Sequence, residues 1–141
     1  MILDYNGTIA RDGKIIEKVK DRINKLSKKL NIYIVTADTF GTVRKEFKDE
    51  NVNIKITDDK ISGTKYKNIV LKELGEEKTT VIANGFNDSL ILKNSLLSIL
   101  VIGTEGVAKE SLLNSDIIVN DVIDAFDLLI HTNRLKATLR K

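Results

Sequence analysis

The sequence has 141 residues, of which 42% are hydrophobic and 30% charged, and it contains no cysteine, proline or tryptophan. This composition is ordinary for a globular protein, so we expect one domain over residues 1–141 rather than a disordered or fibrous chain. The net charge of +3 is too small to imply a nucleic-acid partner. Since no apolar run could cross a bilayer and no export signal is visible, we expect no membrane partner, and the lack of cysteine fits the cytoplasm.

Short runs rich in isoleucine and valine alternate along the chain with longer segments of helical period. The runs are almost continuously apolar, which is typical of strands buried on both faces. Strands are predicted at residues 1–5, 31–37, 52–57, 79–84, 98–103 and 116–120. Helices are predicted at 15–30, 39–50, 64–75, 86–95, 105–114 and 122–140.

The first predicted helix carries an apolar stripe with spacings of three and four, which should face a sheet. The stripe consists of Ile16, Val19, Ile23, Leu26 and Leu30. The polar stretch TDDKISGT, at residues 57–64, is predicted to be an exposed loop. The strict alternation of strand and helix predicts an α/β fold: a three-layer, doubly wound parallel sheet, Rossmann-like, with helices on both faces.

In such folds ligands bind beyond the carboxyl ends of the strands. Polar side chains follow three of the apolar runs: Asp4, then Thr36 with Asp38, then the turn from Asn84 to Asp88. Together with Lys67 they supply a carboxylate, a hydroxyl, a lysine and a second acidic turn. Phosphoryl transfer uses these groups, because a carboxylate can attack phosphorus while lysine, hydroxyl and Mg²⁺ hold the phosphoryl oxygens.

Four stretches resemble the motifs of the haloacid dehalogenase superfamily. LDYNGTIA resembles its DxDGT signature, IVTAD its second motif, KNIVLKEL its lysine motif and NGFNDSLIL its final acidic motif. The last three are especially similar to the phosphorylation domain of P-type ATPases. The chain as a whole resembles small proteins described as P-type ATPase-like predicted phosphatases.

The resemblance implies a role for each matching residue. Asp4 would be the nucleophile, phosphorylated during the reaction, and Lys67 would be the motif lysine, with Lys65 as the alternative. Asn6 would stand at the acid/base position and give its backbone carbonyl to the metal. The phosphate-binding residues implied are Thr36, Ala37, Lys67, Gly7 and Thr8, and the Mg²⁺ ligands implied are Asp4, Asn6, Asn84 and Asp88.

Two positions depart from the superfamily pattern. Asn6 replaces the usual second aspartate, and an amide cannot take up a proton, so breakdown of the phosphoenzyme should be slow. Asn84 replaces the first aspartate of the acidic motif, which removes one negative charge from the metal site. A Mg²⁺-dependent phosphatase is the leading interpretation, and a weak or inactive module that binds phosphate or a protein is the alternative.

The gaps between the motifs leave no room for a cap domain, which the resemblance links to macromolecular phosphates or to a neighbouring subunit acting as a lid. We therefore expect a phosphorylated substrate and allow for a homo-oligomer. His131, the only histidine, lies outside the motifs and is not expected to be catalytic. A receiver domain fits less well, because it would need an acidic pair before the phosphorylated strand. A dinucleotide-binding module would need a GxGxxG turn after the first strand.

Overall fold

The computed structural model describes residues 1–57 and 60–140. Its centre is a six-stranded sheet in the order β5-β4-β1-β6-β7-β8, in which every neighbouring pair is parallel. The strands are β1 (Ile2–Leu3), β4 (Tyr33–Thr36), β5 (Asn53–Ile56), β6 (Thr80–Ala83), β7 (Leu97–Val101) and β8 (Ile117–Val119). All six predicted strands are confirmed, each shorter than its apolar run.

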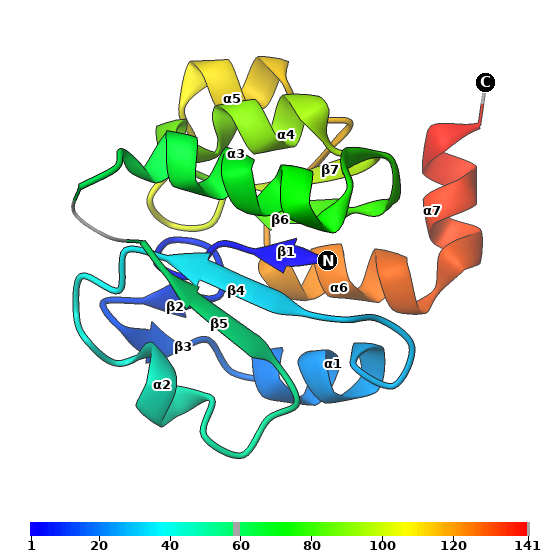
Figure 1. Ribbon diagram of the computed structural model, residues 1–141. Helices are drawn as coiled ribbons and strands as arrows, with labels where there is room; N and C mark the ends of the chain where they lie inside the picture. The colour runs from blue at the N-terminus through cyan, green and yellow to red at the C-terminus, as the bar shows by residue number, and fades with distance from the viewer. Residues whose placement is uncertain (58–59, 141) are drawn as a thin grey trace.

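Helices cover both faces of this sheet (Figure 1), as predicted. One face carries α1 (Val19–Leu26) and α6 (Val122–Ile130), and the other carries α3 (Gly63–Leu74), α4 (Ser89–Asn94) and α5 (Lys109–Leu113). The remaining elements are α2 (Val43–Glu46), α7 (Thr132–Leu139) and the 3₁₀ turns η1 (Glu76–Lys78) and η2 (Phe86–Asp88).

Two apolar clusters fill the spaces between the layers. Because successive strand residues point to opposite faces, Leu3 packs on the side of α1 and α6, whereas Ile2 packs on the side of α3 and α4. The two central strands are buried on both sides, as their apolar runs predict. The strand β8, at the edge of the sheet, differs because Ile118 is 46% exposed.

Several helix predictions need correction. The helix predicted at 39–50 is only α2, the one at 105–114 is only α5, and the one at 86–95 begins with the 3₁₀ turn η2 before α4. The first helix is shorter than predicted: Ile16 precedes it, and Leu30 lies beyond it with 40% of its surface exposed. Only the middle of the predicted stripe, Val19, Ile23 and Leu26, is buried in the helix. The helix predicted at 122–140 is two helices, because the backbone of His131 leaves helical geometry at φ −103° and ψ 70°.

A small hairpin that was not predicted lies between β1 and α1. It pairs β2 (Ala10–Arg11) with β3 (Lys14–Ile15) in antiparallel register. Its turn is Asp12-Gly13, with φ values of 49° and 74°. Two consecutive positive φ values define the tight hairpin turn for which Asp-Gly is a preferred sequence, so this dipeptide was the available signal.

Part of the predicted loop at 57–64 lies outside the described residues, namely Asp58 and Asp59. Lys60, Ile61 and Ser62 are exposed, as predicted, and α3 already begins at Gly63. Among the helices of the described residues, none has the length and apolar character needed to cross a membrane.

Candidate active site

Asp4 follows β1 at the centre of the sheet. Strand β1 pairs with β4 on one side and with β6 on the other, so the chain reverses its winding direction here. Doubly wound folds bind ligands at such a switch point. The backbone N–H of Asp4 still donates to Ile82 O of β6 at 3.0 Å, while its side chain leaves the sheet and is only 7% exposed.

The loop after Asp4 curls back on itself and fixes the carboxylate. Tyr5 O accepts hydrogen bonds from the backbone N–H groups of Thr8, Ile9 and Ala10. Gly7 has a φ of 81°, a region that glycine enters without steric cost. The turn brings the Thr8 hydroxyl within 2.9 Å of Asp4 Oδ2, to which it donates.

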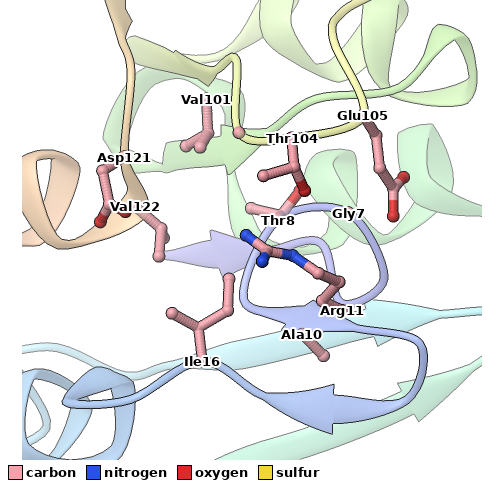
Figure 2. A pocket seen from close by; sticks show the side chains of 11 residues that line it. Gly7, Thr8, Ala10, Arg11, Ile16, Val101, Thr104, Glu105, Asp121 and Val122 are labelled. Atoms are coloured by element: carbon pink, nitrogen blue, oxygen red, sulfur yellow. The ribbon is translucent and has the colours of Figure 1, made fainter.

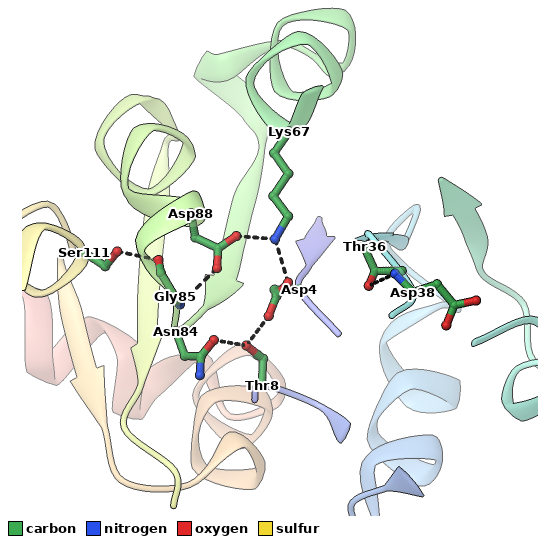
Figure 3. Close-up of polar contacts among 9 residues, drawn as sticks. All are labelled: Asp4, Thr8, Thr36, Asp38, Lys67, Asn84, Gly85, Asp88 and Ser111. Atoms are coloured by element: carbon green, nitrogen blue, oxygen red, sulfur yellow. Dashed lines mark hydrogen bonds and ion pairs between the residues drawn. The ribbon is translucent and has the colours of Figure 1, made fainter. Parts of the chain in front are cut away.

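Lys67 reaches the same carboxylate from α3. Its Nζ lies 2.6 Å from Asp4 Oδ1 and 2.5 Å from Asp88 Oδ1, and the side chain is 1% exposed (Figure 3). Burial alone would lower the pKa of Lys67, but the charges of Asp4 and Asp88 outweigh it and hold the pKa above its usual value. Lys67 therefore stays cationic. Lys65 is exposed, so the geometry favours Lys67 of the two lysines considered from the sequence.

Asp88 is held in place by the turn that follows β6. Its Oδ2 accepts the backbone N–H of Gly85 at 3.0 Å, and the Ser111 hydroxyl of α5 donates to Gly85 O at 2.6 Å. Burial and, next, the charge of Asp4 raise the pKa of the Asp88 carboxyl, whereas Lys67 and the N–H of Gly85 lower it, and together they leave the pKa at about 6. Asn84, the first residue of this turn, places its Oδ1 3.3 Å from the Thr8 hydroxyl.

Thr36 ends β4 on the other side of Asp4 (Figure 3). Its side chain is 3% exposed, and its Oγ1 accepts the backbone N–H of Asp38 at 2.9 Å. This bond leaves the hydroxyl hydrogen of Thr36 for another acceptor. Asp38 in turn uses Oδ1 to accept the backbone N–H groups of Thr42 and Val43 at the start of α2, so it orders the loop after β4. Ala37 is exposed between them.

The oxygens gathered here fit a divalent cation. Asp4, Asn84 and Asp88 offer carboxylate and amide oxygens, which are the ligands that Mg²⁺ prefers. The side-chain Oδ1 of Asn6 is buried and has no hydrogen-bond partner among the described residues, which leaves an acceptor for a cation or a donor. In the part of the chain that the structure describes, no three acidic or histidine side chains cluster as a metal site, so the amides of Asn6 and Asn84 matter.

A small cavity of about 20 Å³ adjoins the loop after β1. Gly7, Thr8, Arg11, Glu105 and Asp121 are among its lining residues (Figure 2). This volume has room for about one water molecule. The cavity is therefore too small to enclose a substrate, and Asp4 is not among its lining residues.

Two residues that the sequence did not single out contribute to this region. Ser111 fixes the turn of Asp88 through Gly85, and the only sequence signal was a serine on the buried side of a helix. Glu105 belongs to the loop between β7 and α5. If Gly7 carried a side-chain carbon, that atom would lie 2.7 Å from Glu105 Oε2 and 2.4 Å from Asn84 Nδ2. The sequence signal for Glu105 was its position shortly after the carboxyl end of β7, the strand next to β6.

Solved structures with the same fold confirm the fold prediction. The magnesium- and phosphate-bound 3-deoxy-D-manno-octulosonate 8-phosphate phosphatase of Moraxella catarrhalis is 17% identical, with a TM-score of 0.69 over 99% of this chain and 91% of that one. The cobalt-bound enzyme of the same name from Haemophilus influenzae is 9% identical, with a TM-score of 0.73 over 99% and 92%. The catalytic domain of the CPx-ATPase CopB-B is 22% identical, with a TM-score of 0.61 over 82% and 46%.

The protein therefore has the fold of the haloacid dehalogenase superfamily. Between Asp4 and Thr36 it inserts only the hairpin and α1, and between Thr36 and Lys67 the described residues add only α2, β5 and the start of α3, so this core carries no cap. The uncharacterized protein MJ0073 of Methanocaldococcus jannaschii is 48% identical over 86 residues, which are 61% of this chain and 92% of that protein. The chain belongs to the same family as MJ0073. No protein-family profile matches it.

Proposed function

We propose that this protein is a Mg²⁺-dependent phosphohydrolase that acts through an aspartyl phosphate on Asp4. The observation that carries the proposal is the buried contact of Lys67 with Asp4 and Asp88, at 2.6 and 2.5 Å. A lysine held there orients the nucleophile and offers its remaining N–H to a phosphoryl oxygen. The solved phosphatases with the same fold support the same reaction class.

Each residue has a defined part in the proposed reaction. An Asp4 carboxylate oxygen forms a bond to phosphorus while the bond from phosphorus to the substrate's leaving oxygen breaks. Thr8 keeps the other carboxylate oxygen in place, and Thr36 donates its hydroxyl hydrogen to the phosphoryl group. The product of this step is a mixed anhydride on Asp4, which water must then hydrolyse.

The metal ligands proposed are Asp4, Asp88, the amide oxygen of Asn84 and the backbone carbonyl of Asn6. When bound, Mg²⁺ would neutralise the charge on the phosphoryl oxygens, so that the anionic carboxylate can approach them. The opposite charges of Lys67 and Asp88 cancel each other. The carboxylate of Asp4 therefore gives these three side chains together a net negative charge.

The proposal is tested by hydrolysis of p-nitrophenyl phosphate with Mg²⁺. We expect slow turnover that requires the metal and falls to background in Asp4→Asn, whose fold is checked by circular dichroism. Equal turnover in the two proteins would rule out Asp4 as the nucleophile. The specific observation in favour of a binding module is asparagine at both position 6 and position 84. Calorimetric binding of phosphate and Mg²⁺ without turnover would establish that second function.

A further inference from the structure

The proposed function leaves one chemical requirement unmet. Hydrolysis of the aspartyl phosphate needs a group that takes a proton from the attacking water. Asn6 stands where the superfamily has an aspartate, and its amide cannot accept that proton. The carboxylates of Asp4 and Asp88 are already engaged, one as nucleophile and one with Lys67.

Glu105 brings another carboxylate to the same loop. The ideal side-chain carbon of Gly7, the neighbour of Asn6, would lie only 2.7 Å from Glu105 Oε2. The two loops also lie close together at Gly103, where an added side-chain carbon would lie 3.5 Å from Gly7 O, an ordinary contact distance. Figure 2 shows Glu105 and the loop of Gly7 on the same side of the small cavity.

The Glu105 carboxylate is available for chemistry. Its side chain is exposed, and no hydrogen bond or ion pair ties it to another of the described residues. Asp121, which lines the same cavity, is engaged because its Oδ1 accepts the backbone N–H of Ile123 at the start of α6. Two glycines with positive φ, Gly103 at 57° and Gly106 at 76°, flank Glu105 and give this loop backbone geometry that other residues rarely adopt.

We infer that Glu105 acts as the general base in the hydrolysis of the phosphoenzyme. It would accept the proton of the attacking water in place of the missing aspartate. This inference rests on the proposed function. The water oxygen forms a bond to phosphorus, and the bond between phosphorus and the Asp4 carboxylate oxygen breaks. One water proton passes to the Glu105 carboxylate, Asp4 returns to its ionised form, and inorganic phosphate leaves.

The test follows the lifetime of the phosphoenzyme. The protein is labelled with radioactive acetyl phosphate and Mg²⁺, the donor is removed, and the loss of label is timed. We expect Glu105→Gln to label as well as the unchanged protein but to lose the label about 100-fold more slowly, the low end of what a general base contributes. Glu105→Asp should fall between them. Glu110→Gln, which neutralises an exposed carboxylate at the start of α5, should decay at the unchanged rate.

Repeating the measurement in a protein that already carries Asn6→Asp separates a catalytic role of Glu105 from a structural one. In Asn6→Asp the restored aspartate can serve as the base, so adding Glu105→Gln should change the decay rate by less than about twofold. Normal labelling with the same decay in Glu105→Gln would overturn the role of Glu105 and leave the proposed function standing. Absence of Asp4-dependent label in every variant would overturn both, because there would be no intermediate to hydrolyse.

Discussion

At the scale of single residues, Asn6 offers a test of the proposed mechanism. Replacing it by aspartate puts a titrating carboxyl two residues after the nucleophile, where the buried Oδ1 of Asn6 now has no partner among the described residues. We expect Asn6→Asp to raise steady-state hydrolysis of p-nitrophenyl phosphate by about tenfold or more. General catalysis is typically worth about 10²- to 10⁴-fold, and Glu105 already supplies part of it.

Asn6→Ala is the matched control for that gain. It removes the amide without adding a proton acceptor, so its rate should not exceed that of the unchanged protein. A similar increase in both variants would show that the amide obstructs the site rather than that a base is missing.

Lys67 and Lys65 offer a second comparison, measured as the free energy of unfolding. Lys67→Met leaves the carboxylates of Asp4 and Asp88 buried without their cation, and removing one partner of a buried ion pair costs about 3–5 kcal/mol. Lys65→Met changes an exposed side chain of the same helix and should cost less than about 0.5 kcal/mol. Urea unfolding at pH 7 measures both. Equal costs would contradict the buried position of Lys67.

At the scale of elements, one ion pair joins the two helices on the same face of the sheet. Arg22 Nε of α1 lies 2.6 Å from Asp127 Oδ1 of α6, and this contact holds the pKa of the Asp127 carboxyl below its usual value. A carboxyl with a lowered pKa in the folded state stabilises the fold above its unfolded pKa of 3.8, and the benefit disappears as pH falls through the folded value.

Asp127→Asn should therefore lower the Tm at pH 7, on the order of 2 °C for a partly exposed pair. The difference from the unchanged protein should shrink at about pH 3, where Asp127 begins to take up a proton in both states. Asp124→Asn removes an exposed carboxylate of the same helix and serves as the control. A Tm difference that stays constant from pH 7 to pH 3 would assign the effect to packing instead of charge.

How much the sequence predicts also differs between elements. The central strands are predicted because burial on both faces leaves a continuous apolar pattern, and the edge strands β5 and β8 are predicted from their apolar runs although they are less buried. The break at His131 is not predicted because no glycine or proline marks it, although the polar residues 131–134 interrupt the apolar pattern there. The hairpin after β1 is not predicted because its strands have two residues each, too few for an alternating pattern.

The candidate site also contains some residues that the sequence predicts and some that it does not. Asp4 and the Asn84–Asp88 turn are predicted because the carboxyl ends of neighbouring parallel strands must share an edge. The choice between Lys67 and Lys65 needs the burial of the helix face, which the structure supplies. Glu105 and Ser111 carry no motif, since their importance comes from packing against Gly7 and Gly85, which are distant in sequence.

At the scale of the whole molecule, the edge that holds Asp4 is open. The carboxyl ends of β4 and β5 lie at the left of Figure 1, next to that of β1, and no cap domain is inserted between the motifs in the described residues. Three large apolar side chains follow the ends of three strands and are exposed: Phe40 after β4, Ile61 after β5 and Phe86 after β6, at 54%, 40% and 61%. We propose that these side chains contact a substrate whose phosphate is carried on a large, partly apolar molecule, and we call the three together the apolar rim.

The last prediction compares two substrates of different size. A phosphothreonine peptide with apolar neighbours should be hydrolysed as well as p-nitrophenyl phosphate, because no cap limits entry. Phe86→Ser should raise the KM for the peptide by about tenfold, since burying part of a phenylalanine ring contributes about 1–2 kcal/mol, and should leave p-nitrophenyl phosphate hydrolysis unchanged. Leu139→Ser, on the exposed side of the remote α7, is the control. If the peptide is not hydrolysed while p-nitrophenyl phosphate is, the open edge serves small phosphates and the apolar rim has another role.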